Sequence, residues 1–375
     1  MNRFVKTFIA CCMVGASCTP KKITAPATSG IQLNYATGFS VHSVGNIHQV
    51  KILSPYAGAK EAYTYLLVPA TEVVPEHAAD VTVIRTPIKS IVCTSTTHIP
   101  LLDYINQTEA LIGFPTTDYI SSEKMRARID AGLITDLGID KGMDLELLFT
   151  KKPDLVMGYT MTSDLGQLKK IQELGIPVVV NAEYLEPHPL GRAEWIKFMA
   201  LFFNEQAKAD SVFKQIEQEY LQTQALAATV NEKPTVLSGI VYGNAWFMPG
   251  GNNYAARLLH DAGTRYLWAD SPTNGFLEVS FESVYEKAHS ADLWIGVGSF
   301  KTLEEIKQAD ARYALFAPYT TKQVYTYNAR KGAKGGSEFL ELGYLRPDLI
   351  LKDLVRIAHP QLLPDYTLYF HEQLK

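Results

Sequence analysis

The sequence has few cysteines, little net charge and few long apolar runs. It has four cysteines in 375 residues, 20% charged residues and a formal net charge of −4. Both signs are spread along the chain without a basic run, which argues against a nucleic-acid partner. Beyond the N-terminal segment, no apolar run is long enough for a transmembrane helix. With 47% hydrophobic residues, the chain can form two packed domains.

The sequence also lacks the motifs of common enzyme classes. It has no Walker phosphate loop, no Gly-x-Ser-x-Gly nucleophile elbow and no His-Glu-x-x-His zinc motif. The glycine pairs at 250–251 and 335–336 lack dinucleotide-binding spacing, and the adjacent Glu304 and Glu305 do not face each other on a helix. We therefore expect a protein that is not an enzyme, with no catalytic residue, no cofactor and no metal site.

The N-terminus has the pattern of an export signal. Arg3 and Lys6 give a short positive region, and the mostly apolar stretch 7–16 is too short to span a bilayer. The small residues before Cys18 resemble the cleavage site of a bacterial lipoprotein. Residues 1–17 are therefore interpreted as a signal peptide and Cys18 as the lipidated residue. An ordinary secretory signal with incidental cysteines is the alternative.

This interpretation places the protein in the periplasm or cell envelope, attached to a membrane through its lipid. The stretch 18–30, rich in Thr, Ala and Pro, is typical of a tether. Cys11 and Cys12 would leave with the signal. Cys93 is then the one free thiol, and a single cysteine cannot form an internal disulfide.

The rest of the chain divides by pattern. Short apolar stretches broken by Pro and Gly predict a β-rich extension over residues 31–87, folded as hairpins. Strand and helix patterns then alternate up to residue 190, and the alternation restarts at 231 and runs to 375. Such alternation predicts parallel sheets flanked by helices. We expect an N-terminal lobe over 31–190 and a C-terminal lobe over 231–375.

Residues 191–230 separate the two lobes. They contain no internal Gly or Pro, and apolar residues such as Phe198, Phe213 and Tyr220 recur at helical spacing. This pattern predicts one long connecting helix, broken once near Asn204. Two ordinary helices belonging to the second lobe are the alternative.

Residues 144–159 carry the strongest family signal. A helix pattern ends at Pro153-Asp154, continues directly into the strand pattern 155–158 and then into a polar, aromatic loop at Tyr159. Ligands bind at the strand ends of open α/β sheets. The arrangement resembles the ABC-transporter substrate-binding proteins for iron–siderophore, haem and cobalamin, over residues 88–360. The resemblance implies an α/β fold of two Rossmann-like lobes joined by a long connecting helix, here with the extra β-rich segment.

The ligand-binding candidates of the first lobe follow predicted strands. The hydroxyls of Thr94, Ser95 and Thr96 can hydrogen-bond ligand oxygens or amides. Tyr159 is expected to face the same cleft. His98 either binds a metal or haem iron, or is an exposed residue of a helix-capping turn.

The resemblance places a segment of the second lobe on the pocket wall, with Tyr242, Trp246, Gly250, Asn252 and Tyr254 as candidates. Aromatic rings offer flat faces to a large planar ligand, and glycine allows close approach. A core position for the tryptophan is the alternative. In a later loop, Arg330 either pairs with an anionic group of the ligand or is solvated.

Two glutamates match a docking feature of the family, which carries one exposed glutamate on each lobe for arginines of the permease. Glu146 lies in the helix pattern before Pro153-Asp154, and Glu282 lies in a Ser-x-Glu helix start. For Glu282, the alternative is a plain helix-start carboxylate that the helix dipole favours.

The resemblance implies a monomeric, lipid-anchored substrate-binding protein of an ABC importer. It would capture an iron(III)–siderophore, haem or a cobalamin-type corrinoid in the cleft and deliver it to a permease dimer. A bare metal ion is disfavoured, because it needs several converging ligands and only His98 is a candidate. The alternatives are a secreted α/β enzyme and a surface lipoprotein that scavenges ligand without a permease.

Overall fold

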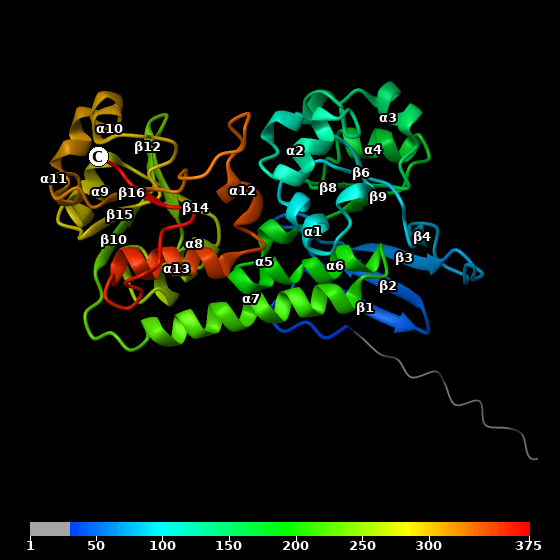
Figure 1. Ribbon diagram of the computed structural model, residues 1–375, viewed down its shortest axis with the longest axis horizontal. Helices are drawn as coiled ribbons and strands as arrows, with labels where there is room; N and C mark the ends of the chain where they lie inside the picture. Colours follow the sequence, from blue (N-terminus) through cyan, green and yellow to red (C-terminus); the bar gives the residue numbers. More distant parts are fainter. Residues whose placement is uncertain (1–30) are drawn as a thin grey trace, which may run out of the picture.

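The computed structural model describes residues 31–375, so the predicted signal peptide, Cys18 and the tether lie outside the described residues. Two α/β lobes lie next to each other, and one long helix runs beneath both (Figure 1). Each lobe contains a five-stranded sheet with parallel pairing. The predicted fold class is therefore confirmed.

The sheet of the N-terminal lobe is parallel throughout, in the order β7-β6-β5-β8-β9. Its strands are β5 (Ile91–Cys93), β6 (Leu111–Phe114), β7 (Thr135–Asp136), β8 (Leu155–Gly158) and β9 (Val178–Val180). Its helices are α1 (His98–Tyr104), α2 (Glu123–Asp130), α3 (Leu145–Lys151) and α4 (Gln167–Glu173). The strand order reverses between β5 and β8, and the crevice at such a point is where ligands bind.

The sheet of the C-terminal lobe has the order β13-β10-β15-β16-β17, with only β17 antiparallel among these strands. Its strands are β10 (Thr235–Ser238), β13 (Arg265–Tyr266), β15 (Leu293–Ile295), β16 (Val324–Thr326) and β17 (Glu372–Gln373). A small antiparallel sheet adds β11 (Ile240–Tyr242), β12 (Ala245–Pro249) and β14 (Phe276–Val279). The helices are α8 (Tyr254–Asp261), α9 (Phe281–Ala288), α10 (Leu303–Ala309), α11 (Ala317–Thr320), α12 (Glu338–Leu342) and α13 (Pro347–Ala358).

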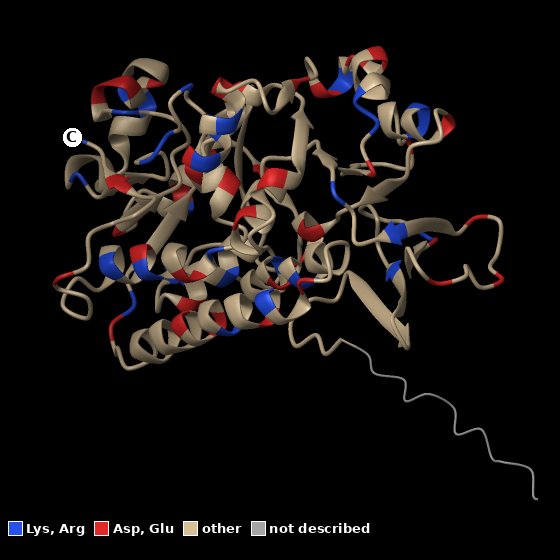
Figure 2. Cartoon of the chain, turned by 45° about the vertical axis from the view of Figure 1, so that its right-hand side comes forward, with Lys and Arg blue, Asp and Glu red and all other residues tan. Residues whose placement is uncertain are grey.

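Short 3₁₀ helices complete the connections, at Thr108–Ala110, Thr117–Tyr119, Asp140–Gly142, Glu183–Leu185 and Ala311–Leu315. Acidic and basic residues are interspersed over both lobes (Figure 2). No helix among residues 31–375 is both long and apolar enough to cross a membrane.

The two lobes share one local hydrogen-bond pattern. In the first lobe, the Asp154 carboxylate accepts the backbone N–H of Ser90 at 3.0 Å, and the Asp154 N–H donates to the Ser90 hydroxyl at 3.0 Å. In the second lobe, Asp292 and Thr235 make the same reciprocal pair, at 2.7 and 2.9 Å. Each aspartate thus ties the strand that it precedes to the start of the lobe's first strand.

The N-terminal extension is a four-stranded sheet, as its β-rich pattern predicted. Its strands are β1 (Phe39–Val44), β2 (Ile47–Ile52), β3 (Tyr63–Pro69) and β4 (Thr82–Thr86). The first three pair antiparallel, but β4 runs parallel to β3. The expectation of hairpins throughout is therefore wrong for β4, because residues 70–81 carry the chain back before it pairs. Val50, Ile52 and Leu67 are buried in the main hydrophobic core.

The region between the lobes contains three helices instead of one. They are α5 (Pro189–Glu194), α6 (Ile196–Leu201) and α7 (Gln206–Ala227). The break near Asn204 is present, and Asn204 has a left-handed φ of 60°. A second break, at Trp195, was not expected. The 22 residues of α7 span about 33 Å and bury Phe213, Ile216 and Tyr220.

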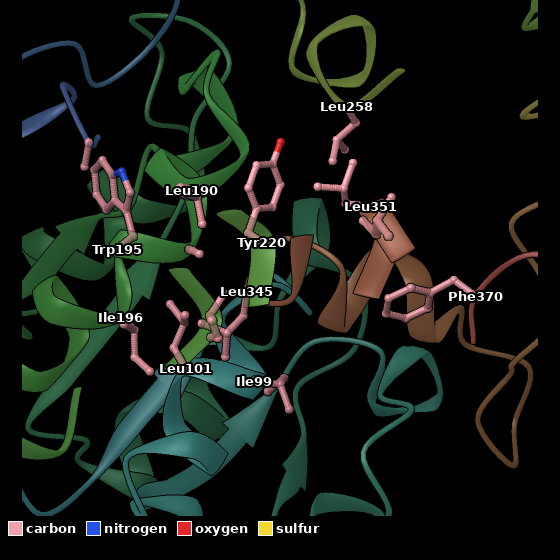
Figure 3. Close-up of a cluster of buried hydrophobic side chains, with 14 of the residues drawn as sticks. Ile99, Leu101, Leu190, Trp195, Ile196, Tyr220, Leu258, Leu345, Leu351 and Phe370 are labelled. Atoms are coloured by element: carbon pink, nitrogen blue, oxygen red, sulfur yellow. The ribbon is translucent and has the colours of Figure 1, made fainter. Parts of the chain in front are cut away.

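One hydrophobic core passes from lobe to lobe through these helices. Leu190 and Tyr220 lie among buried side chains of both lobes, from Leu101 in α1 to Leu258 in α8 and Leu351 in α13 (Figure 3). A smaller cluster covers the other face of the first sheet, around Val92 and Val156. The lobes are therefore joined by packed side chains as well as by the chain itself.

Two buried carboxylates fasten the start of the described chain to the helices. The fully buried Glu194 accepts hydrogen bonds from the backbone N–H groups of residues 34–36 at 2.8–3.0 Å, and from Lys197 Nζ at 2.9 Å. The Glu186 carboxylate accepts the N–H groups of residues 37–38 at 2.7–2.9 Å. We name this set, Glu186, Glu194 and residues 34–38, the N-terminal clasp.

Replacing Glu194, one of the two clasp carboxylates, tests its contribution to stability. Glu194→Gln removes the charge facing Lys197 and puts an amide N–H₂ among backbone donors. Because these groups are buried, we expect the free energy of unfolding to fall by about 2–4 kcal/mol. Urea unfolding monitored by circular dichroism measures the change. Glu232→Gln, at an exposed position, is the control, and an equal effect of both substitutions would contradict the assignment.

Candidate functional site

A cavity of about 340 Å³ lies in the C-terminal lobe. Residues at the carboxyl ends of β10 and β15 and after β16 line it, together with residues of α8, α12 and α13. The lining includes Gly239, Phe247, Tyr254, Leu258, Gly296, Tyr327, Phe339, Tyr344, Leu354 and His371. A mainly apolar cavity of this size, at the strand ends of an α/β sheet, is a typical small-molecule site.

Aromatic rings form much of the cavity wall. Tyr254 begins α8, where the Asn253 side chain caps the helix by accepting the Ala255 N–H. The Tyr254 ring meets the ring of Tyr344 edge-on, with centroids 5.8 Å apart. Tyr327 stacks on Phe339 at 4.7 Å. Such a wall suits a ligand with flat apolar faces.

Arg192 of α5 reaches this wall from between the lobes. Its guanidinium carbon lies 3.6 Å from the ring centroid of Tyr254 and 4.3 Å from that of Tyr344. The backbone carbonyl oxygens of Tyr184 and Glu186 accept its hydrogen bonds at 2.7 and 3.0 Å. A cation held over aromatic faces and largely removed from water interacts strongly with them. The contact joins α5 to the cavity of the second lobe.

A buried polar group lies beside the arginine. The Glu183 carboxylate accepts a hydrogen bond from the Thr97 hydroxyl, and burial raises the pKa of Glu183. Glu183 Oε2 and Arg192 Nη1 are buried and make no hydrogen bond within the described chain. Buried polar atoms are almost always paired, so this junction has unused hydrogen-bonding capacity.

Helix α12 separates the first cavity from a second, more polar one of about 960 Å³. Phe339 and Leu340 face the first cavity, whereas Glu338 and Glu341 line the second. The Glu341 carboxylate accepts the backbone N–H groups of Ser121 and Ser122 of the other lobe, at 2.6 and 2.8 Å. This helix is thus a direct hydrogen-bonded contact between the lobes.

Of the candidates from the second lobe, Tyr254 lies on the cavity wall. Tyr242 is 77% exposed at the end of β11, outside the cavity. In the first lobe, Thr94, Ser95 and Thr96 follow β5, and the Ser95 and Thr97 hydroxyl oxygens lie 2.8 Å apart. Tyr159 follows β8, and its hydroxyl lies 3.5 Å from the Asp140 carboxylate.

Trp246 does not line the cavity, so its pocket assignment is wrong and the core alternative holds. It is fully buried, its indole N–H donates to the Ser238 carbonyl at 2.9 Å, and its ring packs 5.5 Å from that of Trp294. Successive strand residues point to opposite faces of a sheet. Phe247, the next residue of β12, therefore takes the cavity position.

His98 is neither a ligand group nor an exposed capping residue. It is the first residue of α1 and is fully buried, and burial lowers its pKa to about 3. Neither ring nitrogen has a hydrogen-bond partner within the described chain. The helix start also has no side-chain cap, because Thr97 directs its hydroxyl to Glu183.

Three further candidates are occupied by the protein itself. A Cβ on Gly250 would lie 2.3 Å from the Thr273 carbonyl oxygen. The space beside this glycine is therefore filled by a neighbouring loop and not by a ligand. The Asn252 amide donates to the Pro272 carbonyl at 3.0 Å. Arg330 pairs with Glu338 at 2.9 Å and lines the second cavity, apart from the aromatic wall.

The two candidate docking glutamates occupy equivalent positions. Each is the second residue of a helix whose N-cap side chain accepts a backbone N–H, Asp144 for α3 and Ser280 for α9. Both glutamates are exposed. Glu282 lies 3.4 Å from Arg312, an exposed pair of little energetic weight, whereas Glu146 borders a shallow apolar groove with Phe149.

The sequence analysis missed two residues that line this cavity and one that packs against its wall. Tyr344, in the short connection before α13, and His371, in the last five residues, line it. Arg192, which packs on the wall, lies inside the predicted connecting helix, where a charged residue is normally interpreted as part of a solvated face. Periodicity carries no signal for any of them, because all three reach the site through long-range packing.

Two α/β lobes, a shared core between them and an aromatic cavity at strand ends define a bilobal binding protein. A family model described as periplasmic binding protein matches residues 91–330. The chain belongs to this family, whose siderophore- and haem-binding branch the sequence resembles. The family and its structural neighbours are binding proteins and not enzymes.

Individual proteins are similar to this chain in sequence or in fold. A lipoprotein of Methanocaldococcus jannaschii is 27% identical over 334 residues, 83% of this chain and 78% of the relative. The haem-binding protein RhuT of Roseiflexus sp. RS-1 is similar in structure with a TM-score of 0.53 and 16% identity, covering 72% of this chain and 99% of that one. FhuD of Vibrio cholerae, solved with Fe³⁺–Desferal, has a TM-score of 0.52 and 16% identity, covering 73% and 100%.

The Glu341 contact between the lobes predicts a specific pH dependence. Burial raises the pKa of Glu341 to about 7 from the usual 4.5, so the folded protein binds this proton more tightly than the unfolded chain. The stabilisation of the folded protein by protonated Glu341 is then fully present below about pH 4.5 and is lost as the pH rises through about 7. Glu341→Gln should remove this dependence, since the amide does not titrate.

Urea midpoints of wild type and Glu341→Gln at pH 5 and pH 8 measure the effect. The urea midpoint of the variant should rise relative to that of wild type between pH 5 and pH 8. A difference between the two proteins that stays constant with pH would show that Glu341 is ionised throughout this range.

Proposed function

We propose that this protein is the substrate-binding component of an ABC importer for a metal chelate, held at the cell envelope by a lipid on Cys18. It acts as a monomer, captures an iron(III)–siderophore, haem or corrinoid between its lobes, and delivers it to a permease dimer. It catalyses no reaction.

The observation that carries the proposal is the aromatic cavity at the strand ends of the C-terminal lobe, against whose wall Arg192 packs from α5. Its flat rings suit a partly apolar ligand. A bare ion fits poorly, because residues 31–375 contain no group of three or more His, Cys, Asp or Glu placed to hold one. The hydroxyls after β5 and Tyr159 supply polar contacts from the other lobe.

The comparisons support both the ligand class and the anchor. Neighbours of the same fold are described as haem-binding or are solved with an iron chelate. Relatives covering most of the chain are lipoproteins, in keeping with lipidation at Cys18. Matched positions of Glu146 and Glu282 on the two lobes support docking to a permease.

Two other functions have less support. A secreted α/β enzyme would need an activated nucleophile, but Cys93 is fully buried and burial raises its pKa. A lipoprotein that scavenges ligand without a permease would share the same cavity. The docking glutamates separate this alternative from the importer, because only an importer requires them.

Binding is tested by titrating the protein without its signal with ferric siderophores, haem and corrinoids, following tryptophan fluorescence. We expect one class to saturate the protein. Tyr344→Ala should weaken binding about tenfold or more by removing a wall aromatic. Tyr56→Ala, outside the cavity, is the matched control. Equal affinities for wild type and Tyr344→Ala would exclude this cavity as the binding site.

Docking is tested by reversing charge at both glutamates. Cells carrying Glu146→Arg and Glu282→Arg should lose uptake of the ligand, while the purified variant keeps its affinity, because both residues are exposed and neither lines the cavity. Glu304→Arg, on the exposed face of α10, is the control. Unchanged uptake would favour the scavenging lipoprotein.

A further inference from the structure

One segment of the second lobe, residues 328–343, reaches across to the first lobe, and we name it the strap. It leaves the sheet after β16 and folds back on itself, because the Gly332 N–H donates to the Gly336 carbonyl at 2.8 Å. The strap then continues into α12, which lies between the two lobes (Figure 1). It therefore occupies part of the space that a ligand in contact with both lobes needs.

The strap meets the first lobe backbone to backbone. A Cβ added to Gly336 would lie 2.1 Å from the Tyr119 carbonyl oxygen, and one added to Gly332 would lie 2.6 Å from Ser121 Cα. Neither glycine has a left-handed φ, so what requires glycine at both positions is the close approach of the other lobe. The Glu341 carboxylate adds two hydrogen bonds from backbone N–H groups of the same part of the first lobe.

Apolar packing contributes little to holding the strap in place. None of its hydrophobic side chains is fully buried, and residues 329–335 are exposed except for the half-buried Gly332. Phe339 and Leu342 are half-buried, and Leu340 is 51% exposed. Segments with few buried apolar contacts open locally at a small cost in free energy. The strap is thus fastened to the first lobe mainly by hydrogen bonds and glycine contacts, which can break without opening the core.

The strap also divides the space that a ligand can use. The aromatic cavity, about 340 Å³, is lined by the second lobe alone. This volume is at the small end of the roughly 300–1,000 Å³ of small-molecule sites. The more polar cavity of about 960 Å³ has walls from both lobes, and side chains of α12 line both cavities. Withdrawal of the strap would join the two cavities in one cleft with walls from both lobes.

We propose that the strap closes the cleft in the free protein, and that a chelate is captured only after the strap has left residues 119–122. The inference rests on the proposed binding function and concerns its regulation. The apparent association constant is then the intrinsic constant multiplied by the fraction of molecules whose strap is displaced. Weakening the contact between strap and first lobe therefore strengthens binding, whereas damage to a fixed wall of the cleft would weaken it.

Two substitutions weaken this contact in different ways. Gly336→Ala places a methyl group against the Tyr119 backbone, and Glu341→Ala removes the carboxylate acceptor. Gly275→Ala is the matched control, because a Cβ there meets nothing within 4 Å and its φ is not left-handed. Hydrogen exchange of the Ser122 amide, which donates to Glu341, reports separation of the strap in Gly336→Ala without any ligand. Circular dichroism establishes that each variant is folded.

Ferric haem, iron(III)–desferrioxamine and cyanocobalamin are titrated into each protein, following tryptophan fluorescence. We expect the chelate that binds wild type to bind Gly336→Ala and Glu341→Ala about threefold more tightly or better, with Gly275→Ala unchanged. The Ser122 amide should exchange faster in Gly336→Ala than in wild type.

Equal or weaker binding by either strap variant would overturn the strap's role and leave the binding function intact. Unchanged exchange of the Ser122 amide in Gly336→Ala would overturn it as well, because the strap would then be fixed to the first lobe. Binding by the two strap variants alone would support both proposals. Binding of none of the three chelates by any of the proteins would count against both.

Discussion

Burial of one continuous apolar core across both lobes is the constraint on which the rest of the structure depends. The same cluster contains Ile91 of the first sheet, Leu293 of the second and Tyr220 of α7. Side chains in such a core are close-packed, so the lobes cannot separate without exposing them. Ligand capture must therefore use small rotations or loop shifts, unlike the wide closure of proteins whose lobes are joined by extended strands.

Polar contacts between the lobes and the connecting helices add to this apolar packing. Arg192 packs against the aromatic wall from α5, and Glu341 receives backbone N–H groups of the first lobe. Arg346, paired with the buried Asp348, also donates to the Tyr104 hydroxyl of α1 at 3.0 Å. These contacts are directional, whereas core packing is not, so they set the angle between lobes that packing holds together.

Local sequence patterns predict the helices and strands, whereas long-range packing brings the residues of the site together. The segments that form β8 and β9 are short, apolar and bounded by turn residues, which is a local pattern typical of buried strands. Strand alternation also shows that Trp246 and Phe247 face opposite sides of β12, but not which side holds the cavity. The break at Trp195 and the buried position of His98 depend on neighbours distant in sequence. The positions of Arg192 and His371 at the site could not be predicted for the same reason.

The N-terminal clasp has a consequence for the order of folding. Residues 34–38 are synthesised before Glu186 and Glu194, which follow them by about 150 positions. Within the described residues, these backbone N–H groups meet their carboxylate acceptors only in that later segment. The first described residues are thus among the last to be secured, and contacts of such long range form slowly. A chain cut before residue 186 would lack both carboxylates, so its N-terminal end would have no clasp to hold it.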